Sequence, residues 1–305
     1  MKMIIPGQPH HIYQRSSDRG LLFYTASDVL TYYTIYMTYA RLYRITVLGV
    51  CPMRDHVHGM IIPTCKEMMA KFEAATNRAY AVEFNIDTGT KGPLFEHSYN
   101  FAVRKDSKKI RSSIIYLYNN PVEKHLCSKA MDARWNFLAY GFCPNPFSEP
   151  IIIRKASAPM AKNIKEVRFM RERNKYLNQR MLHRMFKNLD AREQSQLADY
   201  IVVTYSGIDY PKLFSYWRSP EDMLTAMNST TGAEYDIGET VNKALSDKAY
   251  SEISHTLEMY YGFKRAKDVL VLPEKKRRNL VSGLKINTDT CEYQIMKFLH
   301  LDTGL

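Results

Sequence analysis

The sequence lacks the cysteine patterns that stabilise small secreted domains or hold structural zinc. Its 305 residues contain five cysteines, an odd number, and none forms a CxxC pair. This spacing argues against a disulfide framework and against the common zinc modules. We therefore expect reduced thiols and a cytoplasmic protein.

Long apolar runs and phosphate-binding loops are missing as well. No apolar run reaches the roughly 20 residues that span a bilayer, and the segment MKMIIPGQPHH is interrupted too early for a signal peptide. The absence of a GxxxxGK[ST] loop argues against ATP binding by a P-loop. No internal repeat or low-complexity tract is present. We expect no association with a membrane.

Charge of one sign is in excess. The chain has 43 Lys and Arg residues against 31 Asp and Glu residues, a formal net charge of +12. A basic balance favours a polyanionic partner, although a soluble protein that is merely basic has the same balance. We expect a nucleic-acid partner and a nucleoid-associated location.

The first half of the chain interleaves strand and helix patterns. Alternating apolar residues predict strands, and apolar stripes between capping residues predict helices. The expected strands are 10–16, 44–53, 56–62 and 94–104, and the expected helices are 27–43, 64–85 and 106–120, the last of them stopped by Pro121. Because several strands follow one another directly, we predict an α+β fold with an antiparallel sheet.

The second half has a different character. A turn-rich stretch at 144–150 separates a domain at 1–150 from a helical domain at 151–305. The expected helices are 162–187, 190–204, 219–228, 239–246, 248–261, 273–284 and 288–300. Residues 273–305 resemble the opening of a helix-turn-helix, with Lys275–Arg278 on phosphates, although plain helical packing is the simpler explanation of the pattern.

Two histidines interrupt the apolar stretch CPMRDHVHGMII, residues 51–62. Side chains at i and i+2 of a strand share a face, so His56 and His58 project together. Two parallel neutral imidazoles can share one divalent ion. The same spacing also fits two unrelated polar positions at a strand end.

A tyrosine and an amide lie one helical turn apart in IRSSIIYLYNNP, residues 110–121. Tyr116 and Asn120 are i and i+4 and so share a face. The Asn120 oxygen would complete a three-residue site that suits Mg²⁺ or Mn²⁺, with Tyr116 beside it as a nucleophile. The same sequence also fits ordinary packed aromatic residues that precede the end of a helix.

Several motifs together resemble the single-tyrosine HUH transposases, and within them the REP-associated tyrosine transposases. The matching pieces run in the family's order across residues 8–150: HIYQR, MRDHVHGMII, NRAYAVEFN with GPLFEHSY, and IIYLYNNPVEKHL. The departure is Arg54-Asp55, where the family has Pro-Asn. If the strand already includes Asp55, its side chain faces away from the histidines.

The resemblance implies an RRM- or ferredoxin-like HUH domain that cleaves and rejoins single-stranded DNA at hairpins. It implies a 5′-phosphotyrosine on Tyr116, with Tyr118 as the second choice, and Mg²⁺ or Mn²⁺ held by His56, His58 and Asn120. Relatives are monomers or homodimers, so the oligomeric state stays open.

Basic side chains near the tyrosine's helix are the candidates for DNA contact, although a solvated charged face explains them equally. They are Arg15, Arg104, Lys105, Lys108, Lys109 and Arg111. Two other functions remain open: a non-catalytic, domesticated protein that binds repeat hairpins, and a metallohydrolase acting on nucleotides, in which Tyr116 would be dispensable.

Overall fold

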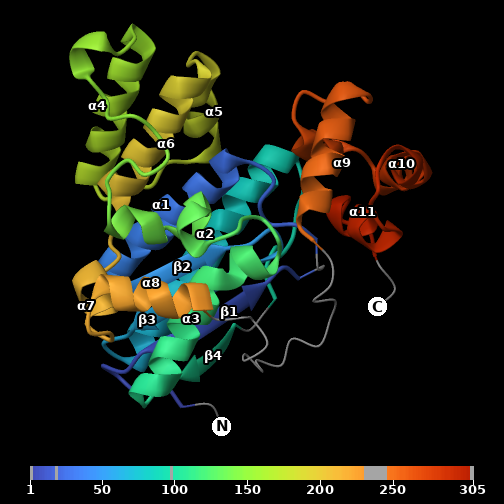
Figure 1. Cartoon of the computed structure of the whole chain (residues 1–305). Helices are drawn as coiled ribbons and strands as arrows, with labels where there is room; N and C mark the ends of the chain where they lie inside the picture. The colour runs from blue at the N-terminus through green and yellow to red at the C-terminus, as the bar shows by residue number, and fades with distance from the viewer. Residues whose placement is uncertain (1–2, 18–19, 97–98, 230–245, 303–305) are drawn as a thin grey trace.

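A four-stranded antiparallel sheet lies at the centre of the fold (Figure 1). The computed structural model describes residues 3–17, 20–96, 99–229 and 246–302. The strands are β1 (His10–Arg15), β2 (Thr46–Pro52), β3 (His56–Ile62) and β4 (Asn100–Val103), in the order β2-β3-β1-β4. Helix α1 (Ala26–Leu42) follows β1 and helix α2 (Lys66–Thr88) follows β3. This is the β-α-β-β-α-β connection of split βαβ units, and the α+β class is confirmed.

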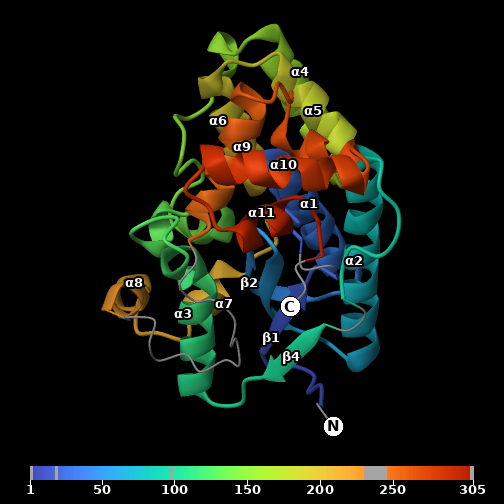
Figure 2. The same cartoon turned by 90° about the vertical axis from the view of Figure 1, so that its right-hand side faces the viewer.

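The two faces of β3 are covered by different helices. Val57 and Ile61 belong to the core formed with α1 and α2, whereas Met60 packs with Ile114 and Tyr118 of helix α3 (Ser107–Glu123). Figure 2 shows α2 and α3 on opposite sides of the sheet. Because alternate side chains of a strand point to opposite faces, the two histidines of β3 lie on the α3 face.

Two predicted boundaries in the first half are wrong. Helix α3 continues through Pro121 to Glu123, because the missing N–H of a proline costs little so close to a helix end, where Lys124 N still donates to the Asn120 carbonyl at 3.1 Å. Strand β4 covers only Asn100–Val103, and Phe95 forms a separate bridge with Ser16.

The second half is helical, with two departures from expectation. The expected helix 162–187 is two helices, separated at 173–178, where Asn174 has a φ of 52°. A short helix at Tyr210–Phe214 was not expected, and the expected helix 239–246 lies almost wholly outside the described residues. The helices are α4 (Ala158–Glu172), α5 (Gln179–Lys187), α6 (Ala191–Tyr205), α7 (Tyr210–Phe214), α8 (Pro220–Ser229), α9 (Lys248–Met259), α10 (Glu274–Asn287) and α11 (Glu292–Phe298).

The helices of the second half share a hydrophobic core with the first. Tyr33 of α1 stacks on Phe137, with ring centroids 4.1 Å apart, and its hydroxyl donates to the Val202 carbonyl of α6 at 3.3 Å. In Figure 1, α4–α6 stand over α1, and α9–α11 form a second group beside them. The division at residue 150 stays a prediction.

A buried ion network joins three distant segments. The Lys267 ammonium lies 2.6 Å from Asp28 Oδ1 and 3.0 Å from Asp87 Oδ2, and its side chain is 1% exposed. Asp28 also accepts a hydrogen bond from Gln179 Nε2 at 2.6 Å and from the backbone N–H of Thr25 at 2.8 Å. Buried charges are tolerated when they are paired and hydrogen-bonded in this way.

Two residues of the basic cluster Lys275–Arg278 make hydrogen bonds or ion pairs within the protein. Arg277 Nη1 donates to the carbonyls of Leu299 and His300, and Arg278 pairs with Glu274. Helices α10 and α11 form the expected pair, and DNA binding by them stays a prediction. Within the described ranges, no helix is both long and apolar enough to cross a membrane.

We expect the pH dependence of stability to report on Glu73 of α2. Burial raises the pKa of this carboxyl to about 8, whereas an unfolded glutamate titrates near 4.3. Because the pKa is raised in the folded state, the contribution of Glu73 to the free energy of unfolding is complete below about pH 4. This contribution is lost as pH rises through 8. Glu73→Gln should remove about 2–4 kcal/mol of that decline. Urea unfolding at pH 5 and pH 8.5 measures it, and an equal decline in both proteins would contradict this origin.

Candidate tyrosine and histidine site

The register of β1 against β3 assembles a polar row on the α3 face. His58 is opposite Tyr13, and His56 is opposite Arg15. The ring centroids of Tyr13 and His58 are 4.9 Å apart, and those of His56 and His58 are 4.8 Å apart with the rings nearly perpendicular. The two histidines thus share a face, as the HxH spacing predicts.

His58 is positioned by a third histidine. His11 Nε2 lies 3.1 Å from His58 Nδ1, and the two rings stack with centroids 5.2 Å apart. Burial holds the pKa of His58 well below its usual range, and burial together with the nearby Arg104 charge lowers the pKa of His11 to about 3. Both rings are therefore neutral at pH 7, which is the form of imidazole that binds metals.

His56 is positioned by Asp55. His56 Nδ1 lies 2.7 Å from Asp55 Oδ1, so the proton belongs on Nδ1 and the lone pair on Nε2. His56 Nε2 is buried and has no hydrogen-bond partner among the described residues. Although burial raises it, the interaction with His56 and the charge of Lys297 hold the pKa of Asp55 well below its usual range. An unpartnered, buried nitrogen beside a second imidazole fits a metal ligand.

The condition under which Asp55 would face away from the histidines, a strand that already includes it, is not met. Strand β3 begins at His56, and Asp55 belongs to the turn before it. Met53 N donates to the His56 carbonyl at 2.8 Å and closes this turn. The alternation of a strand does not extend into the turn, so the carboxylate points at its neighbour's ring.

Tyr116 lies against the histidines, and Tyr118 does not. The Tyr116 ring meets His58 edge-on, with centroids 5.2 Å apart, and His11 at 5.8 Å, and its residue is 4% exposed. The Tyr118 hydroxyl donates instead to the Leu48 carbonyl at 2.9 Å, and burial raises its pKa. It approaches Gly49 so closely that a Cβ there would lie 2.7 Å from the hydroxyl. Tyr118 is therefore a packed core residue.

Asn120 is buried one turn beyond Tyr116, where its amide Nδ2 donates to the Tyr116 carbonyl at 3.4 Å. Among the residues that the structure describes, no three His, Cys, Asp or Glu side chains are arranged to hold a metal ion. The expected ligand set of two imidazoles and an amide contains only two side chains of these four types. Its metal-binding role stays a prediction.

The expected DNA contacts fall into two groups. Lys105, Lys108, Lys109 and Arg111 are exposed around the first turns of α3, where Lys109 pairs with the capping Asp106 at 3.2 Å. Arg15 and Arg104 are half-buried beside the polar row, with the Arg15 guanidinium 5.0 Å from the Tyr13 ring centre. The exposed group lies on the helix that carries Tyr116.

Sequence reasoning missed or misplaced three residues around the histidines: Tyr13, Asp55 and Lys297. Tyr13 could have been found from the alternation of β1, because His11, Tyr13 and Arg15 share one face. Their pairing with β3 needed the register. Asp55 required the start of β3, and Lys297 gives no local signal, because it comes from α11, 242 positions further along the chain.

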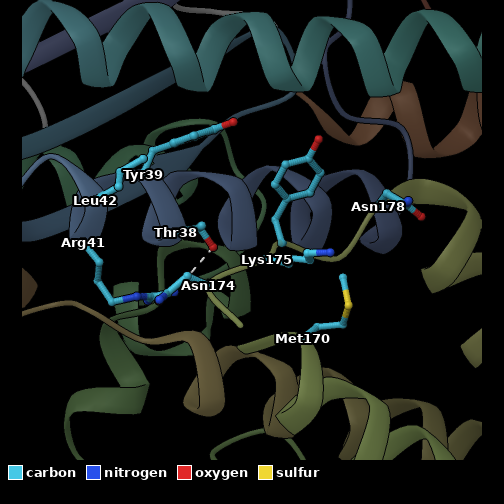
Figure 3. A pocket seen from close by; sticks show the side chains of 9 residues that line it. Thr38, Tyr39, Arg41, Leu42, Met170, Asn174, Lys175 and Asn178 are labelled. Atoms are coloured by element: carbon cyan, nitrogen blue, oxygen red, sulfur yellow. Dashed lines mark hydrogen bonds between the residues drawn. The ribbon is translucent and has the colours of Figure 1, made fainter. Parts of the chain in front are cut away.

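A separate cavity of about 600 Å³ lies between the end of α1 and the connection from α4 to α5 (Figure 3). Arg41 and Lys175 bring positive charge to it, and Tyr39 and Tyr176 bring phenol groups. Because α1 covers the other face of the sheet, this cavity is not part of the tyrosine and histidine site.

Comparison with known proteins gives a distant structural likeness. No protein-family model matches the chain, and no curated protein matches it in sequence. A solved structure described as a REP-associated tyrosine transposase bound to a REP hairpin is 13% identical over 46% of this chain and 82% of that one, with a TM-score of 0.40. The likeness is confined to about half of the chain.

We expect the imidazole pair to bind Mn²⁺ in the absence of DNA. His58→Ala should weaken Mn²⁺ binding by more than about 100-fold. Removal of a residue that only supports a metal ligand costs up to about that much, and loss of a ligand itself should cost more. Isothermal titration calorimetry measures this effect, with His255→Ala, an exposed histidine on α9, as the matched control. Equal Mn²⁺ affinity in both variants would contradict a metal site at these rings.

Proposed function

We propose that this chain cleaves and rejoins single-stranded DNA at hairpin elements through Tyr116, as a transposase of the single-tyrosine HUH kind. The observation that carries the proposal is the edge-on contact of Tyr116 with His58, beside the unpartnered Nε2 of His56. The motif order of the first half supports the same reading. This contact places the Tyr116 ring beside the two imidazoles that would hold a metal ion in this proposal.

The chemistry begins at the Tyr116 hydroxyl. A phenol is a weak nucleophile at neutral pH, because it is almost entirely protonated in water. When it loses its proton and attacks a backbone phosphorus, the bond from phosphorus to the 3′-oxygen breaks, and that oxygen takes up a proton. The products are a 5′-phosphotyrosine and a free 3′-hydroxyl, and reversal onto another 3′-end joins the strands without ATP.

His56, His58 and Asn120 are the residues that would hold Mg²⁺ or Mn²⁺ in this proposal. A bound divalent ion supplies charge that stabilises the transition state on the phosphate oxygens. The chain's own residues orient the imidazoles: Asp55 fixes His56, and His11 fixes His58 through their Nδ1 atoms. Such outer partners hold the two rings in one orientation.

Burial of the site favours a second candidate, a non-catalytic protein that binds hairpin DNA. Tyr116 and His56 are each 4% exposed and His58 is fully buried. A phosphate must reach the Tyr116 hydroxyl for cleavage, whereas binding through the exposed cations of α3 requires no such access. The two candidates differ only in the covalent step.

A covalent-trapping experiment tests the proposed reaction. Labelled single-stranded DNA carrying a hairpin is incubated with the protein and Mn²⁺ and then denatured. We expect a protein–DNA band that survives denaturation and is lost in Tyr116→Phe, because only the phenol oxygen can form the phosphotyrosine.

Tyr118→Phe is the matched control for this experiment. It removes the hydrogen bond to Leu48, at a cost of about 1 kcal/mol of stability, and should keep the band. DNA binding without a band in the wild-type protein would favour the non-catalytic candidate. A band retained in Tyr116→Phe would exclude Tyr116 as the nucleophile.

The salt dependence of DNA binding tests the exposed cations of α3. On single strands each phosphate contact contributes about 0.7 to the slope of log K against log salt. Replacing Lys105, Lys108 and Arg111 together by Gln should therefore lower the slope by about 2. Fluorescence anisotropy at 50–300 mM salt measures it, and Lys187→Gln, exposed on α5, serves as the control. An unchanged slope would place the DNA elsewhere.

A further inference from the structure

The C-terminal helix α11 reaches the histidine site from 242 positions further along the chain. The Lys297 ammonium pairs with Asp55 Oδ2, while Asp55 Oδ1 lies 2.7 Å from His56 Nδ1. The Lys297 side chain is 11% exposed. The two oxygens of one carboxylate thus face the C-terminal helix on one side and the candidate ligand on the other.

Helix α11 is docked at this place by further contacts. The Tyr24 hydroxyl donates to the Phe298 carbonyl at 2.6 Å, and His300 Nε2 lies 2.9 Å from the Leu21 carbonyl. The segment that receives α11 also holds the turn before β3, because Leu22 N donates to the Arg54 carbonyl at 2.6 Å. The position of Lys297 relative to Asp55 is therefore fixed by the backbone on both sides.

We propose that Asp55 and Lys297 are positioning residues, through which the C-terminal helix fixes the ring orientation and the tautomer of His56. A carboxylate held by one partner can rotate about its side-chain bonds, and Asp55 is exposed enough, at 22% of its side chain, to turn toward water. Lys297 holds the second oxygen and prevents that rotation. Asp55 Oδ1 then keeps the proton on His56 Nδ1 and leaves Nε2 as the acceptor.

This inference has a consequence for metal binding, and that consequence rests on the function proposed above. The inference about the orientation of the His56 ring is independent of the proposed function. Outer-shell partners of metal-binding histidines typically change metal affinity by 10- to 100-fold when they are removed. If α11 holds Asp55 in place, the helical half of the chain acts on the ligand geometry without touching DNA or metal.

The test is the tautomer of His56 in the metal-free, full-length protein. Two-bond ¹H–¹⁵N spectra of histidine-labelled protein at one pH distinguish Nδ1–H from Nε2–H, and the His56 signals are identified by their loss in His56→Gln. We expect a single Nδ1–H form in the wild type, and a mixture in Asp55→Ala and in Lys297→Met. Lys297→Arg should restore the single form, because it keeps the charge and a donor.

Lys285→Met is the matched control, since Lys285 also pairs with a carboxylate of α11, at Glu292, but on an exposed surface. It should leave the His56 signals unchanged. An unchanged single form in Lys297→Met, with His300 signals showing that α11 is still docked, would overturn the role of Lys297. An unchanged form in Asp55→Ala would overturn the proposal entirely.

Mn²⁺ titration of the same variants separates this inference from the proposed function. With a metal site at His56, Lys297→Met and Asp55→Ala should weaken Mn²⁺ binding by about 10- to 100-fold, and Lys285→Met should not. A wild-type protein that shows the single tautomer and binds no Mn²⁺ would support the positioning role and refute the metal-dependent reaction.

Discussion

The pairing of β1 with β3 is the constraint on which the site depends. This register places His11 and Tyr13 on the same face as His56 and His58, and it leaves Ile12 and Val57 in the core on the other side. A slip by one residue would exchange the two sets, placing imidazoles among the aliphatic groups under α1 and α2 and aliphatic groups under α3. The hydrophobic requirement on one face therefore fixes the polar row on the other.

Helix α3 adds Tyr116 to this row because the packing of its other side chains fixes how the helix is rotated against the sheet. Ile114 and Tyr118 are buried against β2 and β3, and the absence of a side chain at Gly49 admits the Tyr118 ring. With those contacts made, Tyr116 turns toward the histidines. The packing of Tyr118 thus sets the orientation of Tyr116.

Much of this arrangement could be predicted from local patterns. The alternation of β3 and the spacing of Tyr116 and Asn120 each follow from the period of one element, and the α+β class follows from the order of elements. What could not be predicted depends on junctions and on long-range contacts. The start of β3 decides where Asp55 points, and the strand register decides that His11 meets His58.

The second half of the chain was harder to predict for a physical reason. Its helices are recognisable from composition and caps, but their docking depends on a few polar contacts between residues hundreds of positions apart. Lys297 has the sequence context of an ordinary surface lysine, and only the fold brings it to Asp55. The break between α4 and α5 likewise depends on a residue with positive φ that interrupts an otherwise helical pattern.

The ion network around Asp28 links the two halves of the chain. This carboxylate closes the start of α1 and is neutralised by Lys267, while Gln179 of α5 completes its hydrogen bonds. Replacing Lys267 alone by an uncharged residue would leave an uncompensated negative charge inside the protein, a defect of several kcal/mol. The helical half is thus joined to the start of α1 by a charge pair that lies in the interior.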